Sequence, residues 1–447
     1  MSDYHEIADA LAADIAEGRL RPGQRLPPQR RFARGRGIAN STAARVYGEL
    51  VRRGLAVGEV GRGTFVRAST ATASGGAATA PARRPDGRAV VDLELSFPVL
   101  PEQAQLLADG LGPMLDPSAL ADGLRPVGPD GIPAAREAAA ALLTRSAWTP
   151  DPSRLLFAGN GRQAIAAAIA TLLPAGGRLG VEPMTYPVVK GIAARLGVTL
   201  VPLTMDEHGL VPSSLADAPV RAVYLQPALH NPLGATIPDQ RRIELADVLR
   251  RRGLYAIEDT VYGFLGPDLA PLSAHAPERT ILIDSLSKRL APGLTLGFLV
   301  PPPEMVDAVT AALRSGTWTA AGFVLATAAR WMADGSVATI AAAKRADALA
   351  RQQVASERLA EFDFRADPRA YHGWWELPDP WRADTFVAAA ARRGIAVTPG
   401  AAFAVTPGQA PNAVRLALAA PPLDVLTTAL DTLASLARRN PDELGVE

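Results

Sequence analysis

The sequence predicts a multidomain protein in which a small basic helix-turn-helix unit precedes a larger α/β body. Residues 1–68 contain twelve arginines and seven acidic residues, a net charge of +5, whereas all 447 residues together carry only +1. Residues 69–89 lack hydrophobic periodicity and consist mainly of Ala, Thr, Gly, Pro and Arg, which is typical of an exposed linker. After this linker, short apolar strands end in polar residues, as they do at the ligand sites of open α/β sheets.

Hydrophobic spacing predicts three helices within residues 1–68. Apolar residues at positions 7, 11 and 15 indicate a first helix that ends at Gly18. A second helix begins at residues 26–28 and runs through Phe32, and the glycines at positions 35 and 37 break it. Residues 40–42 cap a third helix, whose apolar positions lie between Ala43 and Val51. The second and third helices fit a helix-turn-helix, whose second helix enters the major groove of DNA.

Two short strands and a high density of arginine complete this unit. Residues 54–57 and 63–66 are predicted to form a hairpin wing, with Arg62 at its tip. Residues 18–53 hold ten arginines and a single acidic residue, so we expect a basic face. Basic faces bind the phosphate backbone of nucleic acids. The sequence therefore predicts binding to double-stranded DNA.

The most informative residue of the body is Lys288, one of only three lysines among 46 basic residues. A lysine amine can form a Schiff base with an aldehyde, which is how pyridoxal 5'-phosphate (PLP) is usually held, whereas a guanidinium cannot. Ser285 and Ser287 precede it and are candidates to bond the cofactor phosphate. Taken alone, the motif also fits an ordinary solvated lysine.

Polar residues upstream of Lys288 extend this prediction. Asp259 follows a strand predicted over residues 253–257, and its carboxylate suits a protonated pyridine nitrogen. Tyr262 and Asn231 are candidates to bond the phenolic oxygen of the ring. Each of these residues has an ordinary alternative role in a turn or a helix cap.

Two earlier motifs suit the phosphate and the ring. Gly161, Arg162 and Gln163 open a helix predicted over residues 164–173, where free backbone N–H groups bind phosphate well. Tyr186 is placed to stack on the ring. The order of the five motifs along the chain, more than any one of them, points to a single cofactor site.

With these motifs in this order, and with residues 291–294 continuing the match, the region from about Leu93 to Leu436 resembles a fold-type I aminotransferase. The resemblance implies an α/β PLP-dependent transferase fold with a smaller α+β C-terminal domain. It implies that Lys288 is the internal aldimine lysine. It also implies that Arg415 grips the carboxylate of a substrate or effector through its bidentate fork.

Two departures from the aminotransferase pattern stand close to the cofactor motifs. Where the family often has an arginine on the cofactor phosphate, this chain has Thr295, and we expect Arg162 or Arg289 to supply the missing charge. His230 and Leu233 flank Asn231 in place of the usual glutamine and threonine, which alters the pocket wall more than the chemistry.

The N-terminal unit closely resembles the winged helix-turn-helix of GntR-type bacterial transcription regulators, with landmarks at residues 18–23, 25–30, 38–42 and 61–66. Family members often have an arginine where this chain has Ala44, so the DNA bases that the family prefers cannot be carried over to this chain. The candidates for DNA contact are Arg25, Arg30, Asn40, Ser41, Thr42, Arg45, Tyr47 and Arg62.

A GntR-like head joined to an aminotransferase-like body is the layout of the MocR subfamily. This resemblance implies a homodimeric regulator in which PLP, or its aldimine with a small amino-compound effector, alters DNA binding. The implied domains are a head (1–68), a linker (69–89), a large PLP-binding domain (90–312) and a small C-terminal domain (313–447). Two alternatives stay open: a genuine aminotransferase acting on an amino acid with an accessory head, and a body that only dimerises the head.

Composition argues against several other classes. The chain has no cysteine, which excludes disulfides and thiolate metal sites, and its five scattered histidines lack the spacing of zinc ligands. The start lacks the apolar region of a signal peptide, and no stretch of about 20 uncharged apolar residues suggests a membrane span. We therefore expect a cytoplasmic protein without a metal site or a membrane anchor.

Overall fold

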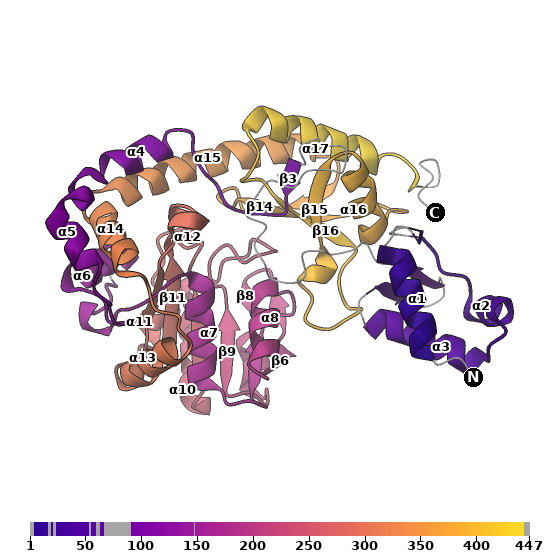
Figure 1. Cartoon of the computed structure of the whole chain (residues 1–447), viewed down its shortest axis with the longest axis horizontal. Coiled ribbons are helices and arrows are strands. Elements are labelled where there is room, and N and C mark those ends of the chain that lie inside the picture. Colours follow the sequence, from indigo (N-terminus) through magenta and orange to yellow (C-terminus); the bar gives the residue numbers. More distant parts are fainter. Residues whose placement is uncertain are drawn as a thin grey trace.

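The computed structural model describes residues 4–16, 19–20, 24–52, 55–59, 63–66, 91–146 and 148–441. Figure 1 shows a head at the right, a large lobe at the left and a small lobe that lies between them at the top. The predicted linker, residues 69–89, lies outside the described residues.

The head contains three helices and a hairpin, as the hydrophobic spacing predicted. Ile7, Phe32 and Leu50, one from each helix, are all buried in its core. The second helix ends at Gly37, whose φ of 63° is left-handed and is adopted by glycine without steric strain. This helix therefore continues past Gly35, where the sequence analysis had placed the start of the break. The elements are α1 (Tyr4–Ala16), α2 (Gln29–Arg36), α3 (Asn40–Arg52) and the antiparallel pair β1 (Ala56–Glu59) and β2 (Gly63–Val66).

The large lobe is built on a seven-stranded sheet in the order β4-β12-β11-β10-β9-β5-β6, in which only β12 runs antiparallel to its neighbours. Its central strands are buried along their whole length, which explains why they are continuous apolar runs in the sequence. The strands are β4 (Leu156–Ala158), β5 (Arg178–Val181), β6 (Thr199–Pro202), β9 (Ala222–Leu225), β10 (Tyr255–Asp259), β11 (Thr280–Ser285) and β12 (Gly297–Val300).

Helices cover both faces of this sheet. One face packs against α7 (Gly161–Leu172), α8 (Pro187–Arg195) and α13 (Val306–Ser315). The other packs against α6 (Pro133–Leu143), α10 (Asp239–Arg252), α11 (Leu272–His275) and α14 (Gly322–Ala333). The carboxyl ends of the parallel strands stay uncovered by these helices and face the small lobe (Figure 1). Further elements are α4 (Gln103–Asp109), α5 (Pro117–Gly123), α9 (Pro212–Ala216), α12 (Leu286–Arg289) and the pair β7 (Met205–Asp206) and β8 (Gly209–Leu210).

The small lobe contains a five-stranded sheet in the order β13-β14-β16-β15-β3. Trp375 and Trp381 are buried edge-on against Phe386 in its core. Its elements are β3 (Val91–Leu93), β13 (Asp363–Arg365), β14 (His372–Glu376), β15 (Ile395–Pro399), β16 (Ala413–Ala417), α16 (Ala383–Arg392) and α17 (Leu423–Ala437). A long helix, α15 (Ser336–Arg358), runs along the top of both lobes in Figure 1.

The two lobes do not divide the chain as expected at residue 312. Strand β3 pairs in parallel with β15 and so belongs to the small sheet, although it precedes every strand of the large one. Helix α14, beyond residue 312, packs on α6 of the large lobe. A single sequence boundary therefore cannot describe these lobes, because β-pairing joins segments about 300 residues apart. Within the described ranges, every helix is too short or too polar to traverse a lipid bilayer.

Candidate cofactor and DNA-binding sites

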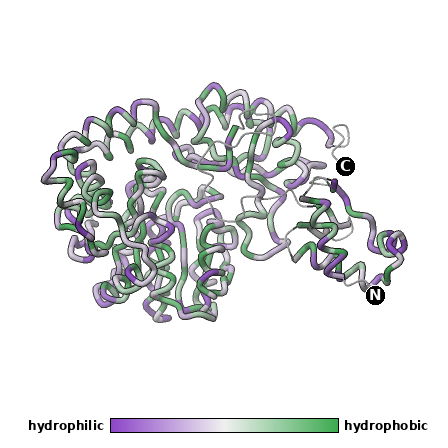
Figure 2. Tube along the Cα trace, in the orientation of Figure 1, coloured by the Kyte–Doolittle hydropathy of each residue, from purple (hydrophilic) through white to green (hydrophobic). Residues whose placement is uncertain are grey.

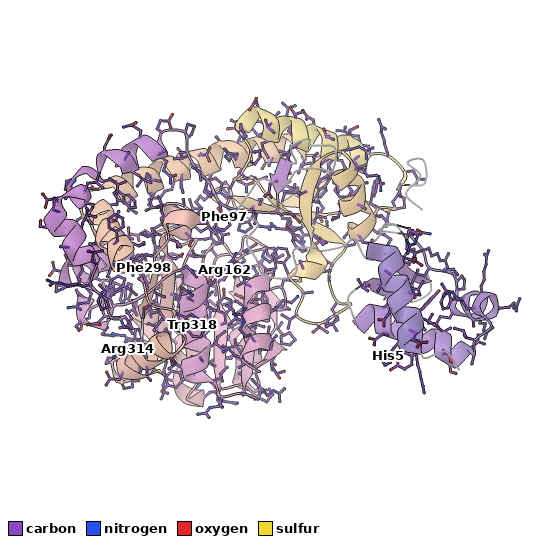
Figure 3. All side chains as sticks on the ribbon, in the orientation of Figure 1. His5, Phe97, Arg162, Phe298, Arg314 and Trp318 are labelled. Atoms are coloured by element: carbon purple, nitrogen blue, oxygen red, sulfur yellow. The ribbon has the colours of Figure 1, made fainter. Side chains whose placement is uncertain are left out.

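A cavity of about 220 Å³ opens at the carboxyl ends of the central strands of the large sheet. It gathers predicted residues from motifs that span 128 positions of the sequence, from Gly161 to Lys288, plus Phe97 from the segment after β3. Figure 3 shows Phe97 above Arg162 in the region between the two lobes. The predicted residues that line the cavity are Gly161, Arg162, Tyr186, Asn231, Asp259, Tyr262, Ser285, Ser287 and Lys288.

Gln163 is the predicted cofactor residue that is not part of the cavity wall. Its backbone N–H donates to Asn160 Oδ1 at 3.0 Å, and its side-chain oxygen lies close to Gly159. Gln163 therefore helps to form the N-terminus of α7 but does not present its side chain to a ligand there.

Lys288 lies on α12, a single helical turn that follows β11 and is capped by the Ser285 hydroxyl. Its Nζ donates to the carbonyl of Ser96 at 2.5 Å and lies 3.8 Å from the centroid of the Phe97 ring. Burial, and then the charges of Arg415 and Arg162, hold the pKa of Lys288 well below its usual value. A neutral amine is the nucleophilic form, so this environment suits attack on an aldehyde.

Asp259 ends β10 and is held by two hydrogen bonds. Tyr224 donates its hydroxyl to Asp259 Oδ2 at 2.7 Å, and the N–H of Val261 donates to Oδ1 at 3.1 Å. Burial nevertheless raises the pKa of Asp259 to about 6. A cationic group beside this carboxylate would favour its ionised form, as a protonated pyridine nitrogen would do.

Substitution of Asp259 by asparagine should stabilise the protein without cofactor at pH 7. The folded pKa lies above the ordinary value of 3.8, so the folded protein binds a proton that the unfolded chain releases. The contribution of Asp259 to stability is therefore full below pH 3.8 and is lost as pH rises to about 6. We expect Asp259→Asn to unfold later in urea at pH 7, by on the order of 2 kcal/mol, with little gain at pH 4. A loss of stability that is equal at both pH values would contradict this electrostatic cause.

One end of the cavity is formed by the N-terminus of α7 and the turn around Lys288, and the start of such a helix suits a phosphate. A Cβ on Gly297 would lie 2.5 Å from the carbonyl oxygen of Asn160, so glycine lets β12 approach the start of α7 closely. Thr295 hydrogen-bonds Ser287 through its hydroxyl and lines the cavity where the family's arginine is missing. Arg162 also lines the cavity and is the cation nearest in sequence to this helix start.

Arg289 is paired with a carboxylate and is not part of the cavity wall, which does not support one of the two expectations for the missing charge. It is buried, and its Nη2 donates to Asp284 Oδ2 at 2.8 Å while its guanidinium lies against the Phe264 ring. Arg145 approaches the same carboxylate to 3.5 Å. The side chain of Arg289 is thus held behind the cavity by a buried carboxylate, which the sequence motif alone did not indicate.

Arg415 lies on β16 beside the cavity, although it is not part of the cavity wall. Its Nη2 donates to the carbonyl of Glu94 at 2.5 Å and to the Thr398 hydroxyl at 3.1 Å. Its buried Nε has no hydrogen-bond partner among the described residues. Burial lowers the pKa of Arg415. A buried guanidinium with an unpaired N–H is suited to receive a carboxylate.

Together these residues fit PLP in their chemistry: an amine for the aldehyde, a carboxylate for the pyridine nitrogen and a helix N-terminus for the phosphate line one cavity. Several contributors had not been predicted. Tyr224, within β9, donates to Asp259, and Gln226, directly after β9, lines the cavity; their place at the end of an apolar strand could have indicated them. Phe97 gave no local signal, because it reaches the cavity only through the pairing of β3 with β15.

The head presents most of the predicted DNA contacts to solvent. Thr42 is half-buried at the start of α3, and Arg62 lies outside the described residues. Figure 2 shows much of α2 in purple, which agrees with the exposed arginines along this helix. The predicted residues that are exposed are Arg25, Arg30, Asn40, Ser41 and Arg45.

Tyr47 is a correction to the predicted DNA contacts. Its side chain is 2% exposed, packs 5.1 Å from the Phe32 ring and donates its hydroxyl to the carbonyl of Pro27 at 2.6 Å. It joins α3 to the start of α2 from within the core. Its position four residues after Ala43 and three before Leu50, which are both buried, places it on the inner side of the helix.

Arg45 and Tyr47 should therefore respond differently to substitution. Arg45→Ala should weaken DNA binding and lower the slope of log affinity against log salt by about one, if the guanidinium binds a phosphate. Tyr47→Phe should cost about 1 kcal/mol of stability, from the lost hydrogen bond, with the salt slope unchanged. Fluorescence anisotropy across a salt series and urea unfolding measure the two effects. A changed salt slope in Tyr47→Phe would restore this residue to the DNA interface.

Comparison with known proteins agrees with both parts of the chain. The family model for aminotransferase class I and II matches residues 119–433, and that for bacterial regulatory proteins of the gntR family matches residues 3–66. The chain is 28% identical over 426 residues to the uncharacterized HTH-type transcriptional regulator YdeF of Bacillus subtilis, covering 94% of this chain and 90% of YdeF. It is 26% identical over 326 residues to the probable rhizopine catabolism regulatory protein MocR of Rhizobium meliloti, covering 68% and 66%.

A solved structure supports the fold of the body. It is LysN, the α-aminoadipate aminotransferase from Thermus thermophilus, with a TM-score of 0.71 and 21% identity over 79% of this chain and 93% of LysN. The fold and the head define a helix-turn-helix transcriptional regulator with an aminotransferase-like domain, of a class that typically binds PLP. The chain belongs to the aminotransferase class I and II family, and its gntR-family head makes it a MocR-type regulator. The predicted fold class is thus confirmed.

Proposed function

We propose that this chain binds PLP at Lys288 and that its DNA binding changes when a small amino compound engages the cofactor. The observation that carries the proposal is the convergence of Lys288, Asp259, Asn231 and Tyr262 on one cavity in a chain with a DNA-binding head. PLP would supply an aldehyde and an electron-withdrawing ring. Lys288 would hold the aldehyde, Asp259 the pyridine nitrogen, and Arg162 with Ser285 and Ser287 the phosphate.

Arg415 supports the inclusion of a carboxylate in the effector. The backbone of the segment after β3 accepts hydrogen bonds from both basic side chains: Glu94 O accepts from Arg415 and Ser96 O accepts from Lys288, each at 2.5 Å. A carboxylate that binds Arg415 would compete with the Glu94 carbonyl. Because this segment follows β3, the first described strand after the linker, its displacement would alter how the chain leading to the head is anchored.

A direct contact gives a second route between body and head. The guanidinium carbon of Arg382, just before α16, lies 5.1 Å from the centroid of the Phe65 ring in the wing. Movement of the small lobe would therefore bias the position of the wing. A regulator needs only such a difference in free energy between two states, and turnover is not required.

We also propose that the chain acts as a homodimer. Exposed apolar side chains lie just before α5, just after it and on α14: Leu115 is 65% exposed, Leu124 86% and Phe323 37%. The two helices pack on each other, and Phe323 lies close to Gly123, the residue before Leu124. Such a surface suits a second copy of the chain, and two heads would then bind two half-sites of DNA.

The alternative function is a complete aminotransferase. It is favoured by Lys288, whose lowered pKa would let its amine also move a proton at the substrate α-carbon. An assay for 2-oxo acid formation from an amino acid donor and a 2-oxo acid acceptor tests this alternative.

The deciding experiment is fluorescence anisotropy of the full chain on DNA from upstream of its own coding region. It is measured without PLP, with PLP, and with PLP plus a panel of amino acids and amines, each paired with its acid or alcohol lacking the amine. We expect PLP plus at least one amino compound to shift the DNA affinity about fivefold or more, a usual size for allosteric coupling. Identical DNA affinities under all conditions would overturn the proposal. Catalytic turnover, found together with such unchanged DNA affinities, would favour the aminotransferase alternative.

A further inference from the structure

All three lysines of this arginine-rich chain point inward. Lys190, on α8, donates to the carbonyls of Ala402 at 3.0 Å and Ala404 at 2.7 Å, and so joins the large lobe to the small one. Lys344, on α15, is fully buried. It donates to the carbonyl of Lys288 at 3.0 Å and also to that of Leu290. No function assigned so far uses Lys344.

The two carbonyls that Lys344 binds lie at the C-terminal end of α12. A helix of four residues has no internal partners for its final carbonyls, and buried carbonyls without partners are costly. Gln103 adds a second donor to Leu290 O at 3.2 Å, whereas Lys344 is the side-chain donor to Lys288 O. The Lys344 amine therefore fixes the peptide unit of Lys288 itself.

We infer that Lys344 is a positioning residue for Lys288: its amine holds the turn α12 so that the Lys288 side chain is directed at the cofactor aldehyde. The inference rests on the proposed role of Lys288 in binding PLP.

Helix α15 extends this role to the small lobe. The Tyr371 hydroxyl donates to the backbone carbonyl of Lys344 and to Asp347, each at 2.8 Å. About two turns after Lys344, Gln352 donates to the carbonyl of His372, the first residue of β14. The same helix thus holds the start of a small-lobe strand and the turn that carries Lys288 (Figure 1).

The charge of Lys344 also affects the pKa of Lys288. The pKa of Lys288 is lowered by burial and by Arg415, Arg162 and Lys344, and is raised by Asp259. Lys344 itself has its pKa lowered by burial to about 7, with only Asp347 acting in the opposite direction. Lys344 is a cation below its pKa of about 7, so its removal takes away a charge beside Lys288 in that range, and the pKa of Lys288 should rise.

The experiment adds PLP to the cofactor-free full chain at a series of pH values between 5 and 9. The measured quantity is the rate at which the absorbance band of lysine-bound PLP appears. Lys344→Met keeps an unbranched side chain, one atom shorter, but removes both hydrogen bonds and the charge. We expect a rate about tenfold lower at pH 7. The midpoint of the pH–rate profile should move upward by a shift on the order of one unit, since fewer Lys288 amines are neutral.

Lys190→Met is the matched control, because it also removes a lysine that donates to two backbone carbonyls, and it should leave the profile unchanged. Lys344→Arg, which restores donors and charge, should recover part of the rate. If Lys344→Met is poorly folded by circular dichroism, Lys344→Gln takes its place, with its two amide N–H donors and no charge; its midpoint should still move upward.

An unchanged midpoint in a folded variant would overturn the positioning role of Lys344. Absence of any lysine-bound PLP in the unmodified protein is a different result, because it would overturn the proposed cofactor site itself.

Discussion

Replacement of Lys288 by alanine will abolish covalent retention of PLP. Lys288 lines the cavity together with Asp259, Asn231 and Tyr262, and burial lowers the pKa of its amine. No other described lysine reaches this place, since Lys190 and Lys344 donate to backbone carbonyls elsewhere. The absorbance band of lysine-bound PLP should be lost completely, whereas weak non-covalent binding through the phosphate persists.

Borohydride reduction followed by peptide mass analysis makes this result specific to one residue. In the unmodified protein the added cofactor mass should fall on the peptide that contains Lys288, and Lys288→Arg should carry none, although its charge is kept. Because the chain has only three lysines, a label on Lys190 or Lys344 would be seen at once and would contradict the assignment. On DNA, Lys288→Ala should bind as the cofactor-free protein does and should not respond to amino compounds.

Prediction from the sequence succeeded where residues of the same site lie close together along the chain. The Asp259 and Tyr262 pair and the Ser285 to Lys288 motif each lie at the end of one strand, so the local order places them at one edge of the sheet. The three helices of the head were likewise apparent from their apolar spacing, with a difference of only a few residues at the end of α2.

The same reasoning failed where the fold joins distant segments. Phe97 reaches Lys288 because β3 pairs with β15, and no pattern near residue 97 indicates a pairing so far along the chain. Lys344 was visible as a rare lysine, but its contact with α12 depends on how α15 packs. Tyr47 was assigned to DNA by resemblance, although it lies one residue from Val46 on the face that fills the core.

Arg162 and Arg289 give the second large expected effect, because they were equal candidates by sequence and have different surroundings. Arg162 lines the cavity, whereas Arg289 is buried against Asp284. We expect Arg162→Ala to lower PLP affinity roughly ten- to a hundred-fold, the usual size for loss of a charge-assisted hydrogen bond, with stability little changed. Equilibrium titration of PLP absorbance measures this effect.

Arg289→Met should have the opposite pattern. It leaves the buried carboxylate of Asp284 without its 2.8 Å partner, and removal of one member of a buried pair costs about 3–5 kcal/mol. Arg145, 3.5 Å from the same carboxylate, should keep the loss near the lower end of this range. The double variant Asp284→Asn with Arg289→Met should regain only part of the stability, because the unpaired carboxylate is gone but Arg145 loses a neighbouring carboxylate. If Arg289→Met instead weakened PLP binding and left urea unfolding unchanged, then Arg289 would be the cation that replaces the arginine missing at Thr295.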